Sequence, residues 1–211
     1  MKTDTLIDML ARNAGPAPRA LAARRLSPAA LAGLVVSALA AVAWFGAIPA
    51  PMFATAVPWT KMAYAGAMAL AAGWLTAQLA RPAAPLRRPQ RATAAVVVAM
   101  AVVGVASLLV EPAGGRLPAL LGHSWSSCPW SVLALSLPGL AAALWAVRGL
   151  APTRPRAAGF AAGLMAGSVG AFGYSLSCPE ASSAFVALWY TLGIALTGAV
   201  GALLGPRVLR W

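Results

Sequence analysis

The sequence contains few charged side chains. Asp, Glu, Lys and Arg together make up 9% of its 211 residues, and only 4 residues are acidic. A soluble domain usually carries about a quarter charged residues. The hydrophobic fraction of 61% and the mean hydropathy of +0.78 therefore exclude an ordinary soluble globular domain. The composition predicts an all-α helix bundle whose outer surface contacts membrane lipid.

Residue types that carry chemistry are also scarce. The chain has 1 histidine and 2 cysteines, with neither a Cys-x-x-Cys motif nor a cluster of histidines. Nothing indicates catalysis, a nucleotide site or a haem site. We therefore expect a protein that is not an enzyme and holds no cofactor, unless a soft metal ion binds at the cysteines.

Uncharged stretches long enough to cross a bilayer occur six times, since a helix needs about 20 residues to do so. They are Pro28–Ile48, Met62–Ala80, Ala92–Val110, Pro129–Val147, Ala157–Ser177 and Ala181–Gly205. Lipid offers no partner for backbone polar groups, so each stretch should be an α-helix. The sequence predicts a polytopic six-helix transmembrane domain over residues 26–211, after a cytoplasmic tail over residues 1–25.

The basic residues predict how this domain is oriented. If the spans cross alternately, only Lys61 and Arg116 fall on one side. The remaining basic residues share the other side: Lys2, Arg12, Arg19, Arg24, Arg25, Arg81, Arg87, Arg88, Arg91, Arg148, Arg154, Arg156, Arg207 and Arg210. The positive-inside rule then places both termini in the cytoplasm.

A net charge of +12 is also typical of nucleic-acid-binding proteins. Here the charges are spread over short segments at helix ends, where topology and anionic lipid headgroups account for them. We therefore expect membrane lipid as a partner and no direct contact with nucleic acid.

Small residues recur at every fourth position in the last two predicted spans. Gly159, Gly163 and Gly167 form one series; Gly193, Thr197, Gly201 and Gly205 form the other. This spacing lets helix backbones approach closely. It favours packing of the two spans against each other, and formation of a homo-oligomer is the alternative.

The two cysteines occupy similar local sequences. Ser127-Cys128-Pro129 and Ser177-Cys178-Pro179 are expected to open the fourth and sixth spans, the second after a tight connection at Cys178–Glu180. Proline is favoured in the first helical turn, so each cysteine should lie at a helix N-terminus, where the helix dipole stabilises a thiolate. Both cysteines are predicted to face the oxidising periplasm.

Three interpretations of this pair remain open. The cysteines could form a permanent disulfide, which requires Cα atoms about 4.4–6.8 Å apart. They could form a reversible redox sensor. They could also bind a soft metal ion, with His123 or Glu180 as further ligands. The metal site has the least support, because two thiols outside a ligand cluster are a weak metal signal.

The cytoplasmic tail contains a short amphipathic pattern. Thr5-x-x-Asp8 predicts a capping box at a helix start, and Gly15–Pro18 should end that helix. Apolar residues lie on one face and acidic residues on the other, as expected of a helix that docks into a partner's groove. The candidate binding residues are Asp4, Leu6, Ile7, Asp8 and Leu10. The alternative is a disordered segment or one that lies on the membrane.

Several motifs together resemble the NrsF-like family of membrane anti-sigma factors. The resemblance covers nearly the whole chain. The motifs are the opening Met1–Asp8, Pro152 with Arg154 and Pro155, Gly163–Gly167, Tyr174-x-Leu176-x-Cys178-Pro179-Glu180, Phe185-Val186, Trp189-Tyr190-x-Leu192-Gly193-Ile194, and Gly205-Pro206-Arg207-x-Leu209-Arg210-Trp211.

The resemblance implies a six-helix inner-membrane protein that holds an extracytoplasmic-function (ECF) sigma factor inactive at its cytoplasmic face. It implies that Cys128 and Cys178 sense oxidants or heavy metals and trigger release. It also makes the tail helix the expected sigma-binding element.

Two other functions are considered from the residues. A membrane thiol-redox protein, which exchanges electrons or disulfides, would also need paired external thiols, but it usually has a Cys-x-x-Cys motif. A small-solute transporter usually places ionisable residues at the membrane centre. No predicted span has one there.

Overall fold

The computed structural model describes residues 3–13, 20–81 and 84–210. Over these ranges the chain forms helices and no strand, as expected of an all-α protein. The longer helices are α1 (Thr3–Asn13), α2 (Leu21–Phe45), α3 (Ala56–Leu79), α4 (Arg87–Val110), α6 (Cys128–Arg148), α7 (Pro155–Tyr174) and α9 (Thr191–Val208).

Shorter elements join the long helices. They are the 3₁₀-helices η1 (Ala50–Ala54) and η2 (Ala113–Gly115), α5 (Arg116–Leu121), α8 (Ser183–Phe185) and the π-helical turn η3 (Val186–Tyr190). The last two lead directly into α9, so residues 183–208 form one continuous helix.

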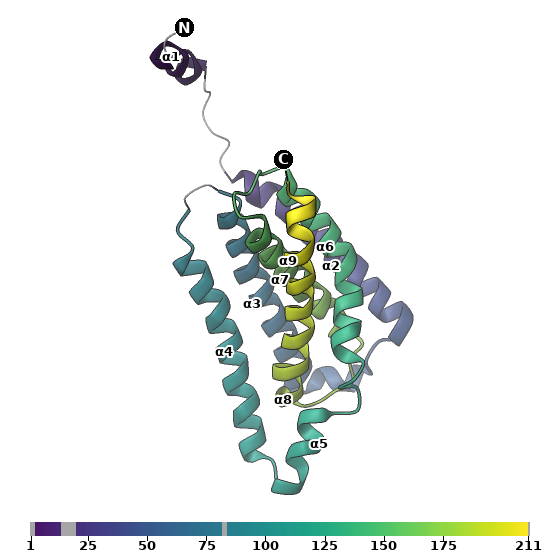
Figure 1. Ribbon diagram of the computed structural model, residues 1–211. Helices are drawn as coiled ribbons and strands as arrows, with labels where there is room; N and C mark the ends of the chain where they lie inside the picture. The colour runs from purple at the N-terminus through teal and green to yellow at the C-terminus, as the bar shows by residue number, and fades with distance from the viewer. Residues whose placement is uncertain (1–2, 14–19, 82–83, 211) are drawn as a thin grey trace.

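Helices α2, α3, α4, α6, α7 and α9 run alternately up and down in one bundle (Figure 1). The start of α2 and the end of α9 lie at one end, here called the terminal end. The start of α6 and the connection between α7 and α8 lie at the opposite end, here called the cysteine end. Both termini of the bundle therefore share one end.

Helix α7 is the centre of the bundle. It packs against α2, α3, α6 and α9, and most of its residues are buried. Its sequence is rich in glycine and alanine, which allows four neighbouring backbones to approach one helix.

The closest of these contacts joins α7 to α9. A Cβ atom added to Gly163 would collide with the Thr197 carbonyl oxygen and lie 2.8 Å from the Gly198 Cα. Added to Gly159 or Gly201, it would collide with the carbonyl oxygen of the other. The prediction that the small-residue series pack against each other within one chain is confirmed.

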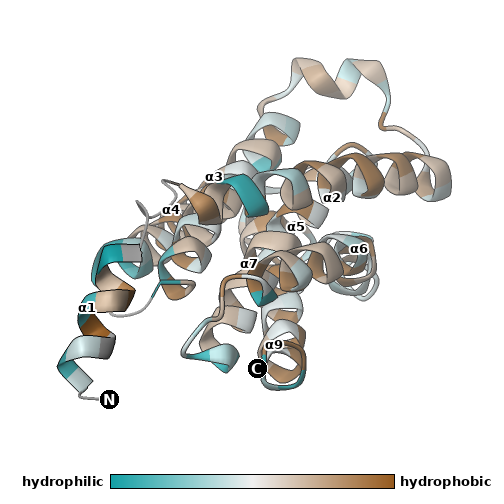
Figure 2. Cartoon of the chain, turned by 90° about the horizontal axis from the view of Figure 1, so that it is seen from above, coloured by the Kyte–Doolittle hydropathy of each residue, from teal (hydrophilic) through white to brown (hydrophobic). Residues whose placement is uncertain are grey.

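Five helices are long and apolar enough to cross a membrane: α2, α4, α6, α7 and the continuous helix Ser183–Val208. Helix α3 is not one of them despite its 24 residues, because Lys61 and Gln78 lower its hydropathy. The expectation of six apolar spans is therefore not confirmed for α3. Hydrophobic residues cover much of the bundle, and hydrophilic ones gather on α1 and near helix ends (Figure 2).

Two predicted boundaries differ from the structure. Helix α2 begins at Leu21 rather than Pro28, so residues 21–25 are helical and continuous with the first predicted span. Helix α1 begins at Thr3, so Thr5 lies inside it and the predicted capping box does not form the helix start. Gly15–Pro18 and the Leu6 side chain lie outside the described part of the chain.

The packing of α7 on α9 predicts a position-specific effect of adding one methyl group. Gly163→Ala should lower the free energy of unfolding by about 1–3 kcal/mol, because its Cβ meets the backbone of α9. Gly66→Ala in α3 is the matched control, since its Cβ would lie 3.6 Å from the Phe172 ring, an ordinary contact. Thermal unfolding of the purified full chain would compare them, and equal stability of the two variants would contradict this account.

Candidate functional site

Both cysteines are free thiols at the cysteine end of the bundle, and both side chains are 0% exposed. Cys128 is the first residue of α6 and follows the N-cap residue Ser127, as predicted. The expected position of one cysteine at a helix N-terminus is therefore confirmed.

Cys178 differs from this expectation, because it lies in an irregular connection rather than at the start of a helix. Its backbone N–H donates to the Tyr174 carbonyl oxygen (3.0 Å), which continues the last turn of α7. The next helix begins only at Ser183, with Ser182 as N-cap. Pro179 cannot donate a backbone hydrogen bond, so the chain leaves the helical path there. Of the two cysteines, only Cys128 therefore lies at a helix N-terminus, where a helix dipole can act on the thiol.

The two thiols belong to one buried polar cluster. The Cys128 thiol lies within electrostatic range of the Cys178 thiol, the Lys61 ammonium and the Glu180 carboxylate. Segments fifty positions apart in sequence, at Cys128 and Cys178, are thus brought together. We call Cys128, Cys178, Lys61 and Glu180 the thiol cluster.

Lys61 was not predicted to be part of any site. It lies near the start of α3, is 0% exposed, and its Nζ donates a hydrogen bond to the Cys178 carbonyl oxygen at 2.8 Å. Burying an ammonium group costs several kcal/mol unless it is well paired, so this side chain is a costly feature to retain. The signal in the sequence was an isolated lysine on the side with few basic residues.

Glu180 joins the two segments that carry the cysteines. The side chain is 7% exposed, and its Oε1 accepts hydrogen bonds from the backbone N–H of His123 (2.8 Å), the backbone N–H of Ser124 (2.9 Å) and the Ser124 hydroxyl (2.9 Å). The Ser124 carbonyl oxygen in turn accepts from the Cys128 N–H at 2.8 Å. Glu180 therefore holds the loop before Cys128 against the connection that contains Cys178.

Gly122 allows this loop to reach Glu180. Its φ of +59° lies in the left-handed region that favours glycine, and a Cβ atom there would collide with the Glu180 carboxylate. A larger residue would therefore be strained and would push the loop away.

Two buried tyrosines lie beside the thiol cluster. The Tyr174 ring contacts the Phe45 ring (centroids 5.6 Å apart) and the Tyr190 ring (5.9 Å). The Tyr190 hydroxyl is buried beside the Cys178 thiol, and the buried Ser177 hydroxyl has no hydrogen-bond partner within the described ranges. A buried hydroxyl without a partner, such as that of Ser177, costs about 1–3 kcal/mol.

Tyr190 also belongs to the π-helical turn η3. Single π-turns are frequent at functional sites, because they change which residues face inward. The neighbouring Trp189 donates its indole N–H to the Leu120 carbonyl oxygen at 2.9 Å, which ties η3 to α5.

The expected metal ligands are not assembled into a site. No group of three or more His, Cys, Asp and Glu side chains that could hold a metal ion occurs in the part of the chain that the structure describes. His123 contributes its backbone N–H, not its ring, to the contact with Glu180.

A surface hollow of about 480 Å³ adjoins the thiol cluster. Its lining includes Glu180, Gly122 and His123, together with Glu111 and Ser182. His123 and Glu180, which line it, also form one of the hydrogen bonds that join the two cysteine segments.

The candidate binding residues of the tail lie far from this cluster. Helix α1 lies apart from the bundle, beyond its terminal end (Figure 1). Asp4, Ile7, Asp8 and Leu10 are all exposed, so they are free to contact a partner. The structure thus assembles the cysteine site and leaves the tail site separate.

Comparisons with known proteins agree over nearly the whole chain. The family model named NrsF, "Negative regulator of sigma F", matches residues 10–211. The chain is 42% identical to "Anti-sigma-F factor NrsF" of Caulobacter vibrioides (strain NA1000 / CB15N), with 100% of both chains covered. It is 39% identical to "Probable anti-sigma-F factor NrsF" of Azospira oryzae (strain ATCC BAA-33 / DSM 13638 / PS), again over 100% of both chains. No solved structure matches the chain.

The hydrogen bonds of Glu180 predict how access to the thiols is controlled. Hydrogen bonds to a charged group contribute about 1.5–3 kcal/mol, so Glu180→Ala should speed maleimide labelling of Cys128 and Cys178 about tenfold or more. Glu111→Ala, at the same hollow, is the control and should leave the rate unchanged. Labelling rates of the purified full chain would be followed by mass spectrometry. Equal rates in the two variants would show that Glu180 does not protect the thiols.

Proposed function

This chain belongs to the NrsF family, and we propose that it is a membrane-embedded anti-sigma factor that holds an ECF sigma factor inactive at the cytoplasmic face. The observation that carries this proposal is the full-length similarity to two proteins named as anti-sigma-F factors. The sigma factor that this chain binds would therefore resemble the sigma-F factors that the names of these two relatives specify.

Six membrane crossings with both termini in the cytoplasm are consistent with the alternating helices. The described basic residues of the bundle, apart from Lys61 and Arg116, lie at or near the terminal end: Arg24, Arg25, Arg81, Arg87, Arg88, Arg91, Arg148, Arg154, Arg156, Arg207 and Arg210. The positive-inside rule assigns that end to the cytoplasm. The cysteine end then faces the periplasm.

Helix α3 would be the sixth crossing even though it is less apolar than the others. Its one charged residue, Lys61, is buried in the bundle and hydrogen-bonded to Cys178. Ionisable residues in membrane helices characteristically face the interior in this way. The composition of α3 is therefore explained by what it contacts, since Lys61 never meets lipid.

Sigma binding is assigned to α1. Its exposed apolar residues Ile7 and Leu10 would enter a groove on the sigma factor, and Asp4 and Asp8 would face basic residues of the partner. An isolated helix of this length is marginal in water, so binding energy would be needed to keep it ordered.

The thiol cluster is assigned to sensing. Both thiols are free, which supports a reversible sensor over a permanent disulfide. An oxidant in the periplasm would remove two electrons and two protons from Cys128 and Cys178 as their sulfur atoms form a disulfide, and would itself be reduced. Direct metal ligation is the weaker alternative, because the Lys61 ammonium lies within electrostatic range of Cys128 and would repel a cation.

Helix α7 offers a route from the thiols to the terminal end. Cys178 follows the last turn of α7. The start of α7 lies beside the end of α9, where Pro155 contacts Gly205. Packed helices switch between discrete arrangements rather than deform continuously. Closing a disulfide would therefore shift α7 and α9 together and weaken sigma binding at the cytoplasmic face.

The sigma-binding assignment predicts which changes release the partner. In co-purification of the full chain with the sigma factor, Ile7→Asp with Leu10→Asp should reduce recovery about tenfold or more, because buried anchors dominate helix-in-groove binding. Met9 is also exposed and apolar, but it lies off that face, so Met9→Asp should have little effect. Full sigma recovery with the double variant would remove α1 from the binding site.

The sensing assignment predicts the behaviour of the thiols. Cells that carry Cys128→Ser with Cys178→Ser should keep the sigma factor repressed and fail to induce its genes with peroxide or hypochlorite. Oxidation of the unaltered chain should lower its mass by two hydrogen atoms without joining two chains. Normal induction in the double variant would rule out the cysteines as the sensor.

A further inference from the structure

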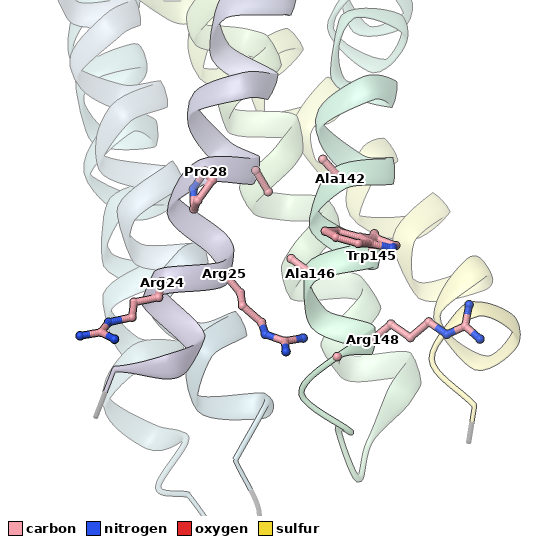
Figure 3. Close-up of a pocket in the computed structure, with 9 residues that line it drawn as sticks. Arg24, Arg25, Pro28, Ala142, Trp145, Ala146 and Arg148 are labelled. Carbon is pink, nitrogen blue, oxygen red and sulfur yellow. The ribbon is translucent and has the colours of Figure 1, made fainter. Parts of the chain in front are cut away.

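A second candidate site lies at the terminal end, on the surface between α2 and α6 (Figure 3). A cavity of about 650 Å³ opens there, and three arginines line it: Arg24 and Arg25 of α2, and Arg148 of α6. Neither the thiol cluster nor α1 contributes to its lining.

No side-chain carboxylate among the described residues of the bundle lies at this end to pair with the three arginines. Figure 3 shows Arg25 extending into the space between α2 and α6, while Arg24 and Arg148 extend outward on either side. The Arg25 guanidinium lies so close to Gly149 that a Cβ atom there would collide with Nη1. The side-chain carboxylates of the bundle, Glu111 and Glu180, are at the opposite end.

The rest of the cavity is apolar. Pro28 and Trp145 line it, and the Trp145 side chain is 78% exposed on the outer surface of the bundle. Ala29 and Ala146 are buried beneath it. Further along the two helices the space is closed, because Gly33 and Gly139 bring their backbones into direct contact. The cavity is therefore a groove with a cationic mouth and an apolar body.

We propose that this groove binds one anionic phospholipid of the cytoplasmic leaflet. Its headgroup phosphate would lie at Arg25, with Arg24 and Arg148 on either side of it, and an acyl chain would lie along Pro28 and Trp145. Arginine suits this role because its planar guanidinium binds phosphate through paired hydrogen bonds. Basic pockets between transmembrane helices on the cytoplasmic side bind anionic headgroups in the same way. The inference rests on the orientation proposed above.

The cationic mouth and the apolar body of the groove together indicate which ligand it binds. A free phosphate ion would use the arginines and leave the apolar body exposed. An acidic protein segment would leave Trp145 facing lipid without a contact. A phospholipid is complementary to both parts, and it is already present where the orientation places the groove.

The test is lipid binding by the purified full chain in detergent, measured by native mass spectrometry. Phosphatidylglycerol and phosphatidylcholine with the same acyl chains would be compared. We expect about tenfold preference for the anionic lipid. Arg24→Gln, Arg25→Gln and Arg148→Gln together should remove that preference.

A matched control removes the same charge elsewhere at the terminal end. Arg87→Gln, Arg88→Gln and Arg91→Gln in α4 lie outside this groove and should keep the preference to within about threefold. Ala142→Leu, which adds bulk to the apolar body without changing charge, should weaken binding of the anionic lipid.

Three results would overturn the lipid site. Equal losses in the two arginine triple variants would mean general charge attraction. Displacement of the lipid by soluble glycerol phosphate at equal concentration would mean a phosphate site, and displacement by a peptide of residues 1–14 would mean a site for α1. Because this assay requires neither the sigma factor nor thiol chemistry, its failure would leave the proposed function standing.

Discussion

The close contact between α7 and α9 is the constraint on which the rest of the structure depends. Gly159, Gly163 and Gly201 bring the two backbones together where any Cβ atom would collide. Since α7 also packs against α2, α3 and α6, this contact sets the centre of the whole bundle. It also fixes the two ends between which the connection with Cys178 must run, and so it places the thiols.

The cysteine end concentrates features that cost stability. Lys61 is a buried ammonium, Glu180 is a nearly buried carboxylate, and the Ser177 hydroxyl has no partner among the described residues. The hydrogen bonds of Lys61 and Glu180 hold distant segments together around unoxidised thiols. For a bundle that spans the membrane as proposed, costly polar groups in the interior are expected where function requires them. The terminal end has the opposite character, with exposed arginines and an exposed helix.

Sequence reasoning predicted the helices well because their signal is local. Apolar length, small-residue spacing and the distribution of arginines are each read along one helix, and the all-α bundle and the pairing of the last two spans were confirmed. It was less accurate at the boundaries. Leu21–Arg25 joined α2. Cys178 fell in an irregular connection, which Glu180 joins to His123 and Ser124, more than fifty positions earlier in the sequence.

The sequence by itself determined the family, the helical class and the two cysteines as the residues of interest. Only the tertiary structure decided that both thiols are buried, that Lys61 and Glu180 surround them, and that three arginines share a groove with Trp145. The physical reason is that hydropathy acts along the chain, whereas burial and hydrogen bonding depend on which helices meet. From the sequence alone, Lys61 is predicted to be a surface charge, and only the packing of the helices shows that it is buried.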